Sequence, residues 1–185
     1  MDGNKIVLET KRLVMRSYEK MDAESIFKVV SNREIAATTI NIPHPYPRET
    51  ADWWVNHVRD NIDKGTAYQF GLFKKDNPDE YIGNCGLVSI SKEHNNGELG
   101  YFIDPGYWNK GYGTEACIKV LEFGFKVLGL ERIYGKCMAK NFASKRVMEK
   151  SGLNDEGIAK NAVLKWGKYE DVCTLGLIRS DWTST

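Results

Sequence analysis

The stretch YWNKGYGTEA, Tyr107 to Ala116, sets two glycines, Gly111 and Gly113, at the head of an apolar helical pattern. Glycine has no side chain, so a ligand can approach the backbone closely at both positions. The first N–H groups of a helix lack intrahelical partners, and the helix dipole favours an anion there. A pyrophosphate suits such a place, and Lys110 could add a charge. A second interpretation is that the glycines only make a tight strand-to-helix connection.

Outward from this turn, the pattern predicts a helix on one side and antiparallel strands on the other. Apolar residues recur at helical spacing over 114–128, and Gly129 is a natural stop. Short polar turns, which favour antiparallel neighbours, join three strand-like segments before the glycines. These segments are AYQFGLFKK (67–75), YIGNCGLVSIS (81–91) and ELGYFI (98–103).

The remaining segments complete a single domain over residues 1–185. We expect strands at 9–18, at 132–138 and twice within 157–178, and helices at 22–32, at 51–65 with Thr50 as its cap, and at 141–153 with Asn141 as its cap. The sum is an α/β fold with about four helices and about seven strands in a mixed, mostly antiparallel sheet. The helical crossover at 114–128 implies one parallel pair of strands.

Composition excludes several classes of protein. The chain has 185 residues, 42% hydrophobic and 28% charged, with a formal net charge of +1. A net charge this close to zero gives no overall electrostatic field that would attract nucleic acid or an anionic membrane. No apolar run approaches the roughly 18 residues that span a bilayer. The start of the chain lacks the apolar block of a signal peptide, so we expect a cytoplasmic protein.

The cysteines and histidines give no sign of a metal site. Four cysteines lie far apart without a CxxC pair, which predicts buried free thiols rather than a zinc site or a disulfide framework. The three histidines are scattered as well. We therefore expect no metal.

Three other nucleotide-binding patterns fit the sequence less well. GYGTEA fits the loose dinucleotide fingerprint GxGxx(G/A), but it stands past mid-chain, after antiparallel strands. The acidic residue about 20 positions on, Glu131, precedes the next strand instead of ending it. The P-loop pattern and the kinase signatures HRD and DFG are absent from the sequence.

At this point the sequence resembles a known family. The blocks GELGYFIDPGYWNKGYGTEA and NFASKRVMEKSGL look like the GNAT acetyltransferases, in the RimJ/RimL-like branch of ribosomal-protein N-terminal acetyltransferases. The acetyl-CoA loop of the family has the form [QR]xxGx[GA], and here Trp108 takes the place of the usual Gln or Arg. The second block matches at Asn141, Ser144 and Gly152. With the opening LETKRLVMR and the tail, the resemblance covers nearly the whole chain.

The resemblance implies where acetyl-CoA binds, with no metal involved. The sheet should be splayed between strands four and five, 98–103 and 132–138, so that pantetheine pairs with strand four like an added strand. The pyrophosphate should lie on the backbone N–H groups of the glycine loop. The implied cofactor contacts are Tyr101, Phe102, Ile103, Trp108, Asn109, Lys110, Gly111, Tyr112, Gly113, Thr114 and Asn141.

Acetyl transfer to an amine asks for a neutral amine, a donor for the carbonyl oxygen and a proton for the departing thiolate. Glu98 is the candidate general base, because the family often uses a carboxylate here; a solvated strand-end glutamate is the alternative. Ser144 is the candidate acid, since the branch has a serine at this place. An ordinary serine near a helix cap is the alternative.

The sequence says less about the residues that bind the amine acceptor. His44, Tyr46 and Tyr169 are candidates for the acceptor pocket, although residues such as Tyr46, Trp53 and Trp54 are more often part of a core than of a pocket. The acceptor could be a protein N-terminal amine or a small amine. A non-catalytic acyl-CoA-binding regulatory module is the alternative function, and it would not need Glu98 or Ser144. An edge strand in the tail could also pair with a second copy in a homodimer.

Overall fold

The computed structural model describes residues 6–183. A single sheet runs through this part of the chain in the order β1-β2-β3-β4-β5-β6-β8-β7. Its strands are β1 (Val7–Glu9), β2 (Leu13–Arg16), β3 (Tyr68–Lys74), β4 (Tyr81–Ser91), β5 (Asn96–Ile103), β6 (Arg132–Met138), β7 (Asn154–Lys165) and β8 (Lys168–Ile178). The helices are α1 (Ala23–Val30), α2 (Arg33–Thr38), α3 (Arg48–Lys64), α4 (Tyr112–Glu122) and α5 (Phe142–Lys150).

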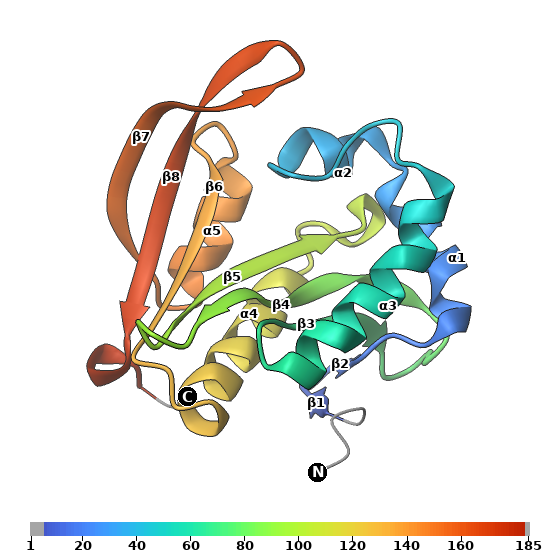
Figure 1. Cartoon of the computed structure of the whole chain (residues 1–185), viewed down its shortest axis with the longest axis horizontal. Coiled ribbons are helices and arrows are strands. Elements are labelled where there is room, and N and C mark those ends of the chain that lie inside the picture. Colours follow the sequence, from blue (N-terminus) through green and yellow to red (C-terminus); the bar gives the residue numbers. More distant parts are fainter. Residues whose placement is uncertain (1–5, 184–185) are drawn as a thin grey trace.

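Helices cover both faces of the sheet, so two cores form (Figure 1). One core joins α4 and α5 to strand residues such as Leu13, Phe70 and Leu99. The other joins α1 and α3 to Tyr18 and Tyr81. All four cysteines are free and buried, as expected.

The predicted parallel pair and the splay are both confirmed. Strands β5 and β6 pair in parallel, from Asn96 opposite Arg132 to Leu99 opposite Gly135, whereas every other neighbouring pair in the sheet is antiparallel. The pairing ends at Leu99 although β5 continues to Ile103. Figure 1 shows the two strands diverging beyond this point, with β6 leading up to α5.

The predicted element counts need correction. Strand β1 makes the described strands eight instead of seven, and α2 makes the α-helices of residues 6–183 five instead of four. Both additions are short, three and six residues, and so too brief to show a hydrophobic period. The cap of α3 is Pro47, not Thr50, which lies inside the first turn. Helix α4 begins at Tyr112 and passes into a π-helical segment, Phe123–Val127.

Within residues 6–183, no helix has the length and apolar character needed to cross a membrane.

Candidate active site

A groove opens where β5 and β6 part. Its volume is about 390 Å³, and its walls come from the end of β5, the glycine loop with the start of α4, one side of α5, and the end of α2. The lining residues are Ile35, Thr38, Thr39, Tyr101, Phe102, Ile103, Tyr107, Trp108, Asn109, Gly111, Tyr112, Gly113, Thr114, Asn141, Ala143, Ser144, Arg146, Val147 and Lys150. All the cofactor contacts that the resemblance implied are among them except Lys110.

The strand wall of the groove offers unpaired backbone. The N–H of Asp104 bonds to the carbonyl of Ile82 on β4, so alternation turns the backbone groups of Tyr101 and Ile103 toward the gap beside β6. The backbone N–H and C=O of Phe102 face β4 instead. The Trp108 indole donates to the Ile103 carbonyl at 2.6 Å, so this carbonyl is already used. Tyr101 therefore supplies most of the unpaired backbone groups on this edge of β5.

The glycine loop delivers a helix N-terminus to the groove. Gly111 is the cap of α4, with φ +82°, and Asn109 is also left-handed at +59°. The first intrahelical bond runs from the N–H of Glu115 to the carbonyl of Gly111, so the three N–H groups before it have no helical partner. A Cβ on Gly113 would come 3.6–3.7 Å from Val147 and Ile103, in the narrow space between α4, α5 and β5.

Lys110 does not face the groove. Its ammonium donates to the Gly106 carbonyl at 2.8 Å, and its own carbonyl accepts a bond from Arg12 at 2.9 Å. The expectation that Lys110 adds a charge at the anion site is therefore not met in this conformation, because the side chain folds back over its own loop.

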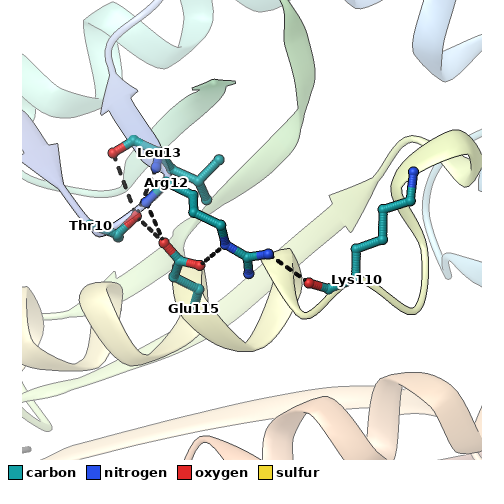
Figure 2. Close-up of polar contacts among 5 residues, drawn as sticks. All are labelled: Thr10, Arg12, Leu13, Lys110 and Glu115. Carbon is teal, nitrogen blue, oxygen red and sulfur yellow. Dashed lines mark hydrogen bonds and ion pairs between the residues drawn. The ribbon is translucent and has the colours of Figure 1, made fainter. Parts of the chain in front are cut away.

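Arg12, from the turn before β2, fastens this loop to α4 (Figure 2). Its Nε donates to Glu115 at 2.7 Å, its backbone N–H donates to the same carboxylate at 2.8 Å, and its guanidinium carbon lies 4.2 Å from the centre of the Tyr112 ring. The Thr10 hydroxyl adds a third bond to Glu115. Burial by itself would raise the pKa of Glu115, but the bonds from Thr10 and Arg12 outweigh it and lower this pKa.

Asn141 organises the other wall. Its side-chain oxygen accepts from the N–H of Ser144 at 3.0 Å, which confirms Asn141 as the cap of α5. Its amide nitrogen donates to the carbonyl of Thr38 at 2.9 Å and so ties α5 to the end of α2. The amide thus holds two walls of the groove together while it lines the groove itself.

Ser144 meets a phenol that sequence reasoning missed. The Tyr101 hydroxyl donates to the Ser144 carbonyl at 2.9 Å and lies 2.8 Å from the Ser144 hydroxyl. Burial, followed by the nearby Cys117 thiol, raises the pKa of Tyr101 well above its usual value. The phenol therefore stays protonated at neutral pH, and the pair places two hydroxyl groups at the base of the groove. Tyr101 was expected in the groove for its backbone groups, and its phenol reaches Ser144 from β5.

Glu98 stands apart from the groove. It shares the face of β5 that carries Phe102 but precedes it by four residues, roughly 13 Å of extended strand. The Tyr134 hydroxyl donates to its carboxylate at 3.3 Å, and the Lys136 ammonium lies 3.4 Å away. A proton could pass between Glu98 and the groove only through an intervening water or the substrate itself.

The three acceptor candidates do not come together. His44 is exposed, Tyr46 packs against the core under α1 and α3, and Tyr169 is 63% exposed. Tyr169 shares a face of β8 with Cys173, which packs toward α5. None of the three lines the groove. Trp53, expected in a core or a pocket, is 54% exposed and stacks on His57.

Another contact joins the β7–β8 hairpin to α2 and to the loop after it. The β7–β8 hairpin extends beyond the sheet and bends toward α2 (Figure 1). Near its tip, Lys165 donates to the carbonyls of Ile40 at 3.3 Å and Ile42 at 2.9 Å, and Arg33 lies over the Trp166 ring. Burial, with Lys140 nearby, lowers the pKa of Lys165.

Sequence reasoning also missed Arg12, the end of α2 and the outer part of α5. Arg146, Val147 and Lys150 line the groove. Val147 follows Ser144 and Arg146 follows Ala143 at a spacing of three, as does Lys150 after Val147, a signal that was present in the sequence. The approach of Arg12 and of Thr38 had no local signal, because it depends on tertiary packing.

The groove combines an open strand edge, a positive helix end and a pair of hydroxyl groups, a set that fits an extended ligand with an anionic group and a reactive end. Among residues 6–183, no group of three or more His, Cys, Asp or Glu side chains is arranged to hold a metal ion.

Comparison with known proteins agrees with this geometry. The model of the Acetyltransferase (GNAT) domain matches residues 12–154. The uncharacterized N-acetyltransferase YnaD of Bacillus subtilis is 32% identical, with 95% of this chain and 98% of YnaD covered. The structure of RimL, a ribosomal L7/L12 alpha-N-protein acetyltransferase in complex with coenzyme A, gives a TM-score of 0.85 at 18% identity, with 94% and 98% covered. Spermidine N-acetyltransferase of Vibrio cholerae, with CoA and spermine, gives 0.78 at 23%, with 91% and 96% covered.

Proposed function

Because the chain belongs to the GNAT acetyltransferase family, and is thus an acetyl-CoA-dependent N-acetyltransferase, we propose that it acetylates a primary amine by direct attack on the thioester. The acceptor is a protein N-terminal α-amine or a small-molecule amine. Both classes have support, since RimL is named for a protein α-amine and the Vibrio cholerae enzyme was solved with spermine.

The groove between the free edge of β5 and the start of α4 is the observation that carries this proposal. Pantetheine would pair with the backbone of Tyr101 and the N–H of Ile103, and the diphosphate would accept bonds from the N–H groups of residues 111–114. The thioester would then lie over the hydroxyl groups of Tyr101 and Ser144. The strand geometry and the helix end support this placement.

The transfer itself needs few groups. The neutral amine gives its lone pair to the thioester carbon, the carbon–sulfur bond breaks, and the sulfur leaves as thiolate. The amine nitrogen loses one proton, which Glu98 accepts through water. The thiolate takes up one proton, either from Ser144, which then regains one from solvent, or directly from solvent while Ser144 donates a hydrogen bond to the sulfur. The Tyr101 hydroxyl lies 2.8 Å from the Ser144 hydroxyl and fixes its place. Glu98 and Ser144 are proposed roles that rest on the resemblance and on these contacts.

A thiol-release assay tests the proposal. Purified protein is incubated with acetyl-CoA and a panel of amines: peptides with different N-terminal residues, spermidine and spermine, and simple alkyl amines. Appearance of free CoA that depends on one acceptor class, with the acetylated product identified by mass spectrometry, would support it. Tight binding of CoA with no turnover on any acceptor would favour the non-catalytic module instead.

A further inference from the structure

The orientation of one peptide decides whether the glycine loop can hold an anion. In a trans peptide the carbonyl and the following N–H point in opposite directions. The carbonyl of Lys110 points to Arg12, so the N–H of Gly111 points away from Arg12. Gly111 lines the groove at a φ of +82°. Because glycine adopts positive and negative φ about equally readily, the backbone itself does little to keep this peptide from turning over.

The side chains of the loop do not supply the missing restraint. The Trp108 indole is engaged with the Ile103 carbonyl, and the Lys110 ammonium with the Gly106 carbonyl. Neither reaches the Lys110–Gly111 peptide. The carbonyl of Lys110 is instead held from outside the loop, by a residue about a hundred positions earlier in the chain.

Arg12 is itself fixed in place. Glu115 accepts from its Nε, and the Tyr112 ring lies beneath its guanidinium, so both anchors belong to the first turn of α4. The guanidinium fork thus links that turn to the preceding loop carbonyl (Figure 2). A planar fork with two directed donors suits this link in a way that a lysine ammonium does not.

We propose that Arg12 is a positioning residue for the diphosphate of acetyl-CoA: it holds the Lys110 carbonyl on the outer side of the loop, so that the Gly111 N–H faces the groove. The role is indirect, since Arg12 is not among the groove-lining residues. This inference rests on the proposed function, because it assumes that the groove binds acetyl-CoA.

The test compares Arg12→Ala with a matched variant, Arg16→Ala. Arg16 stands on β2, pairs with Asp22 at 2.8 Å and lies over the Phe73 ring, so it has the same kinds of contact away from the loop. We expect Arg12→Ala to raise the Kd for CoA and the KM for acetyl-CoA about tenfold, as for the loss of one charge-assisted hydrogen bond. The KM for the amine should change less than twofold. Arg16→Ala should leave both constants for the coenzyme unchanged.

A truncated thioester separates positioning from a merely structural role. Acetyl-pantetheine lacks the diphosphate, so its kcat/KM should be the same for the wild type and for Arg12→Ala. Arg12→Lys keeps the charge but loses the fork, and we expect it to recover only part of the affinity for CoA. Thermal unfolding of each variant shows whether the fold survives. The backbone N–H of Arg12 still bonds to Glu115 after substitution, which favours survival.

Three results would overturn the inference. The first is an unchanged Kd for CoA in folded Arg12→Ala. The second is an equal loss of activity with acetyl-CoA and acetyl-pantetheine, which would make Arg12 a general structural residue. The third is an equal weakening of CoA binding by Arg16→Ala. A wild-type protein that binds no CoA would instead refute the proposed function, so the two failures are distinguishable.

Discussion

The two ends of the groove are built differently. At the glycine loop, which we propose as the coenzyme end, the binding groups belong to the backbone, and partly buried charged side chains such as Arg12 and Glu115 hold that backbone in place. Beside the end of α2, which we propose as the acceptor end, a long hairpin makes the contacts: Lys165 bonds to the loop after α2, and Trp166 lies under Arg33 of α2. In the proposed function, the first end presents a fixed set of donors for an invariant coenzyme. The other offers mostly loop and exposed side chains, which can vary with the amine.

The largest effect should come from filling the coenzyme end. In Gly113→Trp the indole must enter the space between α4, α5 and β5, where even a Cβ comes within 3.6 Å of Val147. We expect CoA affinity to fall at least about 100-fold, measured by calorimetric titration. Thermal unfolding serves as the control for folding. A folded variant that retains its affinity would remove the glycine loop from the coenzyme site.

Ser144 lies between the two ends of the groove, and Ser144→Ala should lower the rate of acetyl transfer. We expect kcat to fall about 10- to 100-fold, the range of a proton-transfer contribution, with the KM for acetyl-CoA within about threefold. Ser151→Ala is the matched control, since Ser151 caps the end of the same helix, its hydroxyl bonds to the Val147 carbonyl, and it does not line the groove. Equal losses in kcat and in coenzyme affinity would make Ser144 a binding residue.

The hairpin contact tests the acceptor end. Lys165→Met keeps the apolar stem but removes both bonds to the loop carbonyls. Steady-state kinetics should show the KM for the amine rising about threefold to tenfold, the cost of one or two modest hydrogen bonds, while the KM for acetyl-CoA stays the same. Lys160→Met, on the same hairpin but paired with Asp171, should change neither. An effect confined to acetyl-CoA would contradict the division between the two ends.

The smallest effect concerns acid stability at the coenzyme end. The pKa of Glu115 is lowered in the fold, so its contribution to stability is present above the ordinary carboxyl value and is lost as the pH falls through the lowered pKa. Glu115→Gln should reduce the free energy of unfolding by about 1 kcal/mol at pH 7. Urea unfolding should show this difference shrinking below pH 4.5, the ordinary value. A constant difference at all pH values would show that Glu115 does not titrate with folding.

The same division explains what the sequence could predict. The glycine loop, the cap at Asn141 and the parallel crossover follow from local patterns. The residue-by-residue set of contacts came from the resemblance to the GNAT family, and nearly all of it lines the groove. Lys110 was the exception, because nothing local shows that its ammonium turns to Gly106. Arg12 and the Tyr101 phenol join the site through packing between distant strands and helices. The acceptor candidates had only aromatic composition to support them, and His44 and Tyr169 proved exposed.

Arg12 and Glu115 are 103 positions apart in the chain. Bringing them together costs loop-closure entropy and belongs to the slow, non-local part of folding. A nascent or truncated chain that ends before Glu115 would therefore have no finished coenzyme loop, however well its first strands had paired. A truncation from the start of the chain that reaches past Thr10 would remove groups that hold this loop in place, although the loop itself is synthesised a hundred residues later.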